Sequence, residues 1–145
     1  MGFTKMLSVV ILAAMSFVGL NATAAGDFAE KKIVLQVSDK ESHTKVLNVA
    51  ANIVKHYGQD QVAVEIVAFG SGLGVLVANK KNKNLARVTS LAGSGVKFNA
   101  CGNTIRKMTK KNGKAPKLHA SATKVPAGVI RILELQEKGY TLIRP

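Results

Sequence analysis

Residues 32–69 read KIVLQVSDKESHTKVLNVAANIVKHYGQDQVAVEIVAF, and this stretch decides the fold class. Its two ends, 32–37 and 62–69, are rich in β-branched residues and almost continuously apolar, which is typical of buried parallel strands. Its middle has apolar residues at helical spacing. The stretch therefore predicts a strand, a helix and a second strand, which together form the repeating unit of a parallel sheet.

The helix of this unit has a start signal, an apolar face and a stop signal. Ser38 and Glu41 have the spacing of a capping box, which predicts the helix start. Gly58 follows the last apolar position and is a natural stop. The apolar face runs through Val46, Ala50, Ile53 and Tyr57, with Leu47 and Val54 beside it.

The alternation of strands and helices continues toward the C-terminus. Further strands are predicted over 96–100, in a segment ending near 125, and over 141–143. Helices are predicted over 70–78, 85–92 and 103–111, and a last one begins at Pro126 and buries Val129, Ile132 and Leu133. This order predicts a small α/β domain in which helices cover both faces of a mostly parallel sheet.

The N-terminal segment has the order of a secretory signal. After Lys5 comes an uncharged apolar run over 6–20, and small residues follow up to Ala24 and Ala25. The run is shorter than the roughly 20 residues of a spanning helix, so stable membrane insertion is not expected. We therefore predict a signal peptide over 1–25, a domain over 26–145, and a periplasmic location.

Composition excludes several classes of function. The single Cys excludes an internal disulfide and a multi-cysteine metal site, and the three His residues have no ligand spacing, so neither a metal nor another cofactor is predicted. The formal net charge is +13, but only 5% of residues are aromatic and none interrupts the basic run over 106–117. An exported protein with this pattern is not expected to bind nucleic acid.

The loops after the strands define a predicted crevice, because ligands bind at the carboxyl ends of an open parallel sheet. The loops are 38–43, 70–74, 101–104 and 126–128. The glycine cluster at 70–74 lacks the spacing of a phosphate loop and is better explained as a turn that lets backbone approach closely. His43 is either a base or a solvated turn residue. The residues predicted to line the crevice are His43, Gly70, Gly72, Asn103 and Thr104.

Cys101 is the candidate reactive residue. It ends a predicted strand, and Gly102, Asn103 and Thr104 lead into a helix, so its sulfur should lie at a helix N-terminus, where free amides stabilise a thiolate. Arg106 and Lys107 could lower its pKa further. The thiol is then expected to be at least partly accessible; the alternative is a small buried hydrophobic residue.

Four segments of the chain resemble the DsrE/DsrF-like (YchN-like) family, and in particular its exported branch. They are 95–104 (GVKFNACGNT), 125–131 (VPAGVIR), 135–140 (LQEKGY) and 143–145 (IRP). The resemblance implies a five-stranded parallel sheet flanked by helices, assembly into homotrimers or homohexamers, and a sulfur-relay role in which Cys101 carries a persulfide.

Two functions follow from these observations. The first is an exported thiol-based sulfur carrier or sulfurtransferase-like protein, which exchanges sulfur with a donor or acceptor thiol protein. The second is a non-enzymatic oligomeric binding module of the periplasm, in which the crevice holds a small ligand and Cys101 is structural.

Overall fold

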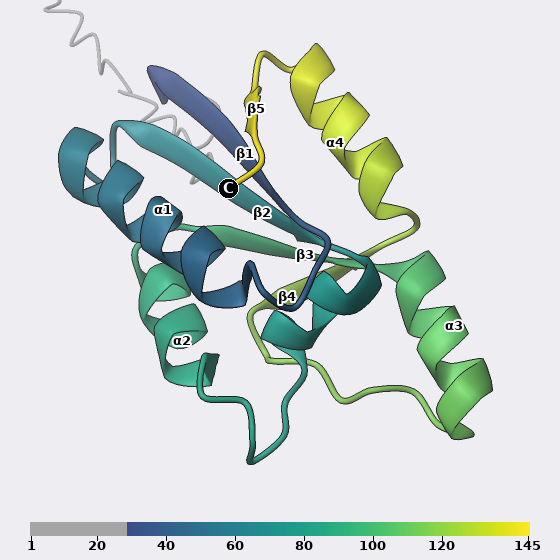
Figure 1. Cartoon of the computed structure of the whole chain (residues 1–145). Helices are drawn as coiled ribbons and strands as arrows, with labels where there is room; N and C mark the ends of the chain where they lie inside the picture. The colour runs from purple at the N-terminus through teal and green to yellow at the C-terminus, as the bar shows by residue number, and fades with distance from the viewer. Residues whose placement is uncertain (1–28) are drawn as a thin grey trace, which may run out of the picture.

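The computed structural model describes residues 29–145, and the predicted signal peptide over 1–25 lies outside them. Five strands form one sheet in the order β4-β3-β2-β1-β5, and every neighbouring pair is parallel (Figure 1). All seven residues of β2 are buried, because β2 is the central strand. The strands are β1 (Lys31–Val37), β2 (Val62–Ala68), β3 (Lys97–Cys101), β4 (Ala122–Val125) and β5 (Thr141–Ile143).

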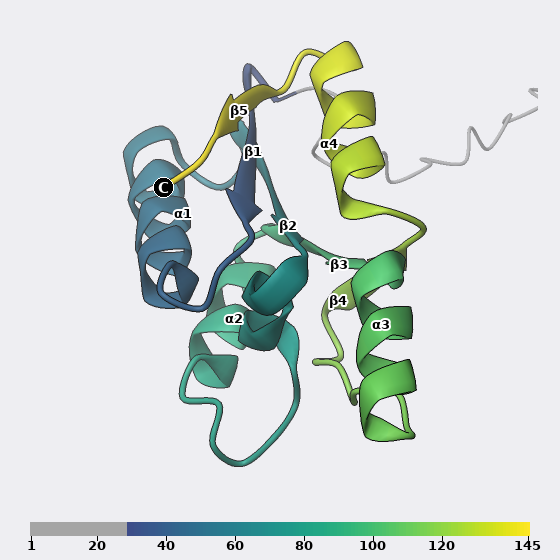
Figure 2. The ribbon, with the colours of Figure 1, turned by 45° about the vertical axis from the view of Figure 1, so that its right-hand side comes forward.

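The helices divide unequally between the two faces of the sheet. They are α1 (His43–Tyr57), η2 (a 3-10 helix, Gly70–Leu76), α2 (Leu85–Gly93), α3 (Gly102–Asn112) and α4 (Gly128–Glu137). Figure 2 shows α1 and α2 on one side of the sheet and α4 on the other. Successive crossovers from β1 to β4 move in one direction and share a face, whereas the return from β4 to β5 places α4 on the opposite face. The predicted five-stranded parallel sheet flanked by helices is confirmed.

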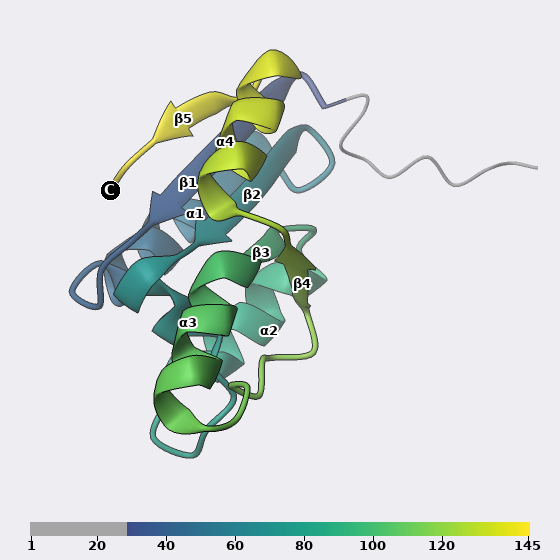
Figure 3. The same ribbon diagram turned by 90° about the vertical axis from the view of Figure 1, so that its right-hand side faces the viewer.

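The core is correspondingly thick on one side and thin on the other. The larger cluster lies between the sheet and α1, η2 and α2, and includes Leu35, Leu47 and Phe98. Ile105 of α3 joins it, although α3 extends past the carboxyl ends of the strands (Figure 1). The smaller cluster includes Val67 and a few residues under α4, which crosses β1 and β2 in Figure 3. One helix therefore covers this second face.

The start of α1 differs from the capping-box prediction. The helix begins at His43, with Ser42 as its N-cap residue, and Glu41 is exposed. Asp39 accounts for the difference: its Oδ1 accepts a hydrogen bond of 2.8 Å from the Ser42 amide. The Ser42 hydroxyl, and to a smaller extent this amide, lower the pKa of Asp39. This side-chain turn carries the chain through 39–42 before the helix begins.

The last helix also differs from its prediction. It begins at Gly128 after the N-cap Ala127, so Pro126 lies two residues before it. Val129 and Leu133, both predicted to be buried, are 56% and 50% exposed. The sheet contacts the other side of α4, through Ile132 and Leu135. The prediction that Ile132 is buried is confirmed, and the exposed side of α4 is the one with Val129 and Leu133.

Candidate functional site

Cys101 lies at the junction of β3 and α3, as predicted. It is the last residue of β3 and the N-cap residue of α3, with an extended backbone. The first amides of a helix have no partners within the helix, so they are free to donate to the sulfur. Cys101 is therefore placed where a thiolate is stabilised by backbone dipoles.

Two glycines let the β4–α4 connection approach this junction closely. A Cβ on Gly102 would lie 2.8 Å from the carbonyl oxygen of Val125. A Cβ on Gly128 would lie 3.1 Å from a ring carbon of Phe69 and 3.3 Å from the Cβ of Cys101. With no Cβ in the way, the Gly128 amide donates a hydrogen bond of 3.2 Å to the Cys101 sulfur. The sulfur is thus held between the starts of two helices.

The surroundings of Cys101 lower the pKa of its thiol below the ordinary value. Burial acts to raise the pKa, but hydrogen bonds from the amides of Thr104, Gly128 and Asn103, and from the Thr104 hydroxyl, outweigh it. These donors are all uncharged. Arg106, whose guanidinium bonds the Asn103 side chain, and Lys107 are not among these causes. A thiolate here depends on amide and hydroxyl geometry more than on nearby cations.

The prediction of a partly accessible thiol is wrong for this structure. Cys101 is only 5% exposed, and the Gly128 amide lies 3.2 Å from its sulfur. Free cysteines are commonly buried in this way. Little of this residue is therefore open to solvent in the folded chain.

A groove lies next to the thiol, across the first turn of α3. It has a volume of about 520 Å³, and Gly70, Asn103 and Thr104, three of the predicted crevice residues, line it together with Lys107 and Lys111. The Thr104 hydroxyl accepts a hydrogen bond of 3.0 Å from the Gly70 amide, which joins η2 to α3. Cys101 does not line this groove, so the first turn of α3 separates the sulfur from it.

The other two predicted crevice residues have different roles. His43 lines a second cavity with Lys40 and Lys81, and its Nε2 lies 3.1 Å from the carbonyl oxygen of Ser71. The structure therefore does not bring His43 to the sulfur as a base. Gly72 is buried, and a Cβ there would lie 2.3 Å from the carbonyl oxygen of Val37, so this glycine serves close packing.

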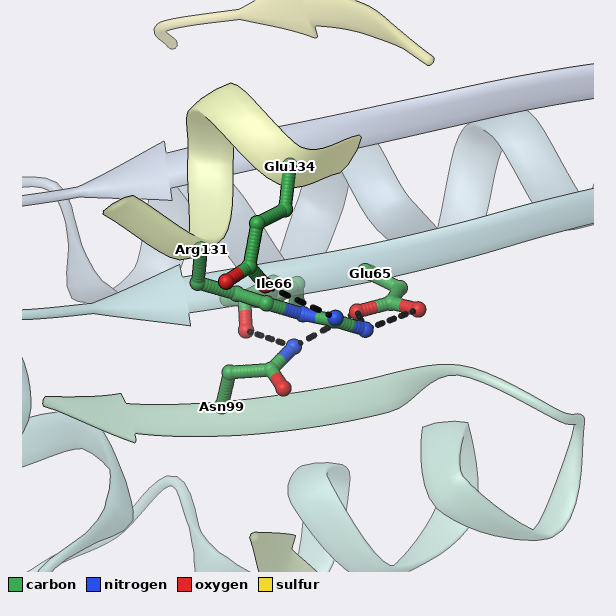
Figure 4. A network of polar contacts seen from close by, with 5 residues as sticks. All are labelled: Glu65, Ile66, Asn99, Arg131 and Glu134. Carbon is green, nitrogen blue, oxygen red and sulfur yellow. Dashed lines mark hydrogen bonds and ion pairs between the residues drawn. The ribbon is translucent and has the colours of Figure 1, made fainter. Parts of the chain in front are cut away.

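Sequence reasoning missed a polar network on the α4 face of the sheet (Figure 4). Glu65 of β2 is 2% exposed, and both its carboxylate oxygens accept hydrogen bonds from one guanidinium nitrogen of Arg131, at 2.9 and 3.1 Å. Asn99 of β3 is also buried and donates a hydrogen bond of 2.9 Å to Glu65. The signal was present in the sequence: Glu65 is the one charged residue of the strand VAVEIVA.

Residues 29–145 hold neither a metal-binding cluster nor a membrane-spanning helix. No group of three or more His, Cys, Asp or Glu side chains is arranged to hold a metal ion. None of the helices there has the length and apolar character that crossing a bilayer requires.

The fold and the thiol together define an open parallel α/β protein with a cysteine at a helix N-terminus. The DsrE/DsrF-like family matches residues 31–145, so the chain belongs to that family. The family suggests a sulfur-relay-like role, and the chain has a single Cys. Among curated proteins, none matches the chain.

A solved structure supports the same fold. The chain is similar to the protein of unknown function MTH1491 from Methanobacterium thermoautotrophicum, with 28% sequence identity and a TM-score of 0.66. The match covers 80% of this chain and 100% of that one. The relative thus spans a domain of the same extent.

Proposed function

We propose that this chain is an exported thiol-based sulfur carrier or sulfurtransferase-like protein that holds sulfur as a persulfide on Cys101. The observation that carries the proposal is the sulfur at the N-terminus of α3, with the Gly128 amide donating to it. The lowered pKa of Cys101 provides thiolate, which is the nucleophilic form.

The proposed step is an exchange of sulfane sulfur without net oxidation or reduction. The Cys101 thiolate attacks the outer sulfur of thiosulfate, a Sγ–S bond forms, the donor S–S bond breaks, and sulfite leaves with its electron pair. A persulfide donor reacts in the same way and leaves as a thiolate. Unloading reverses the roles: an acceptor thiolate takes the outer sulfur, and Cys101 leaves as a thiolate. Amides that face the sulfur stabilise negative charge in both forms.

Mass spectrometry of the intact folded protein tests this function. Incubation with thiosulfate or polysulfide should add the mass of one sulfur atom, and dithiothreitol should remove it. Cys101→Ser is the control, because a hydroxyl keeps most of the volume but forms no persulfide. A wild-type protein that gains no sulfur at any pH from 6 to 9, yet gains it after denaturation, would contradict the proposal.

The alternative function is a non-enzymatic oligomeric binding module with a structural Cys. Two observations favour it: Cys101 is 5% exposed, and the groove of about 520 Å³ lies beside it without including it. A binding module should take up a small anion equally well in wild type and Cys101→Ser. The sulfur carrier should differ between them, so one titration calorimetry experiment with thiosulfate on both proteins separates the two functions.

We also propose that the protein is periplasmic and assembles as a homotrimer or homohexamer. The apolar and basic pattern of 1–25 supports export. The exposed apolar residues of α4, which are Val129, Ile130 and Leu133, support self-association. N-terminal sequencing of the exported protein and light scattering at micromolar concentration test the two parts. An intact Met1 in the membrane fraction, or a monomer only, would contradict them.

The donor or acceptor is proposed to be another thiol protein, since a persulfide is passed on by attack of a thiolate. Cys101 is the only cysteine of the chain, so release of the sulfur cannot occur through a second thiol of the same subunit.

A further inference from the structure

The buried polar network and Cys101 lie on the same face of the sheet. Asn99 and Cys101 are two residues apart on β3, so both side chains point to the face that α4 covers. On α4, Gly128 and Arg131 are three residues apart, about one helical turn. The network and the thiol therefore both connect β3 to α4, at positions about one helical turn apart on α4.

Two hydrogen-bonded links connect the sheet to the first turn of α4. Gly128 donates its amide to the Cys101 sulfur at 3.2 Å, and Arg131 donates to Glu65 at 2.9 Å. Asn99 donates to the same oxygen of Glu65 at 2.9 Å and so orients it (Figure 4). Asn99 and Cys101 are joined by the backbone of β3, and Arg131 and Gly128 by that of α4. Together with the hydrogen bonds, these backbones form a closed loop that includes the sulfur.

The first turn of α4 has few other attachments. Its N-cap residue is Ala127, and no side chain caps the helix. Val129 and Ile130 are 56% and 53% exposed in the single chain, so neither contributes much buried area within it. The apolar contacts of α4 come from Ile132 and Leu135, in the following turns. The position of the Gly128 amide thus depends on the packing of Gly128 against Phe69 and Cys101 and on the anchoring of the same turn by Arg131.

We propose that Glu65 and Arg131 are positioning residues, whose ion pair, oriented by Asn99, holds the start of α4 so that the Gly128 amide stays on the Cys101 sulfur. Neither side chain bonds the sulfur itself. The inference rests on the proposed function, since it treats the thiol as the reactive group. Loss of the pair should displace the amide, weaken its hydrogen bond to the thiolate and raise the pKa of Cys101.

Charges around the pair must be separated from this geometric effect. Lys32 of β1, Lys97 of β3 and Lys138, just after α4, line a cavity of about 440 Å³ with Glu65 and Arg131. Glu134 also bonds Arg131, and Arg106 of α3 is the cation near Gly102, beside the thiol. A variant that removes both charges of the pair leaves the net charge unchanged, so its effect reports geometry.

The test variant combines Glu65→Gln with Arg131→Met, which leaves no uncompensated buried charge. Its control combines Glu137→Gln with Arg144→Met, two exposed residues with the same charges. The measurement is the pH midpoint of iodoacetamide alkylation of the folded protein, with hydrogen exchange of the Gly128 amide beside it. We expect the alkylation midpoint to rise by about one pH unit, which is a tenfold loss of thiolate at pH values below the midpoint. We also expect the Gly128 amide to exchange its hydrogen faster. The control should match wild type.

Arg131→Lys gives a second measurement if the double variant does not fold. Lysine keeps the charge but has no planar guanidinium. The alkylation midpoint of Cys101 in this variant should therefore lie between that of wild type and that expected for the double variant. An unchanged midpoint in a folded variant overturns the inference. Alkylation needs no sulfur donor, so failure of sulfur loading in wild type would be recorded separately and would count against the proposed function alone.

Discussion

The two faces of one sheet differ in how they are covered. The face under α1, η2 and α2 is an apolar core, with Leu35, Leu47 and Phe98 packed at 0 or 1% exposure. The face under α4 has a single helix, a buried ion pair and the thiol, and an apolar stripe of α4 remains exposed. Most of the apolar packing thus lies on one side of the sheet, and the buried ion pair and the thiol lie on the other. The face under α1, η2 and α2, called the thick side, packs apolar residues against β2 and β3. The face under α4, called the thin side, contains the polar residues Glu65 and Asn99 of these strands.

Matched leucine truncations should show this difference most strongly. Leu47→Ala should lower the free energy of unfolding by about 4 kcal/mol, because the packed side cannot collapse into the cavity. Leu135→Ala removes an equally buried side chain, but α4 can shift, so we expect about 2–3 kcal/mol. Urea denaturation of both variants measures the two values. Equal losses would show that α4 is held as rigidly as α1.

Gly128→Ala should disturb the packing of α4 against Cys101. The new Cβ would press on Phe69 and Cys101, which we expect to cost about 1–2 kcal/mol and to raise the alkylation midpoint of Cys101. Gly93→Ala is the matched control, since its Cβ would meet nothing within 4 Å. Chemical denaturation and pulse alkylation should find the control near wild type. If the Gly128→Ala protein is as stable as wild type and its alkylation midpoint is unchanged, the close approach of α4 to Cys101 does not require a glycine at this position.

Leu133→Glu should separate self-association from folding. Leu133 is 50% exposed in the single chain, so the free energy of unfolding of the monomer should change by no more than about 0.5 kcal/mol. The proposed assembly should dissociate, because a charge then replaces the proposed apolar contact between copies. Light scattering measures the oligomeric state. Asn52→Glu, at an exposed position of α1, is the control that adds the same charge elsewhere. An intact oligomer in Leu133→Glu would place the interface elsewhere.

The smallest effect concerns pH. The pKa of Cys101 is lowered in the folded state, so the unfolded chain binds more protons between the two pKa values, and stability rises with pH across that window. The contribution is fully present above the unfolded pKa of about 8.5 and disappears as pH falls through the folded pKa. Unfolding of wild type and Cys101→Ser between pH 6 and 9 measures it. The same pH dependence in both proteins would mean that the thiol is not stabilised as a thiolate.

Local sequence was sufficient for the order of elements and for the place of Cys101. Runs of β-branched residues at 32–37 and 62–69 favour buried strands, and the change to helical spacing between them indicates the parallel unit. The glycine after Cys101 and the polar residues beyond it mark a helix start. These are short-range properties of the backbone, so they can be read without knowing the neighbours.

Tertiary structure alone decided which side of α4 is buried and what reaches the sulfur. Val129 and Ile132 are equally apolar in sequence, but only the crossover from β4 to β5 turns Ile132 to the sheet. The Gly128 amide lies 27 residues from Cys101 in the chain, and Arg131 lies 66 residues from Glu65. Contacts at such separations depend on how the strands are ordered, which no local pattern specifies. The sequence by itself determined a thiol at the start of α3, whose own amides lower its pKa, and the packing of α4 against it decided its burial and added the Gly128 hydrogen bond.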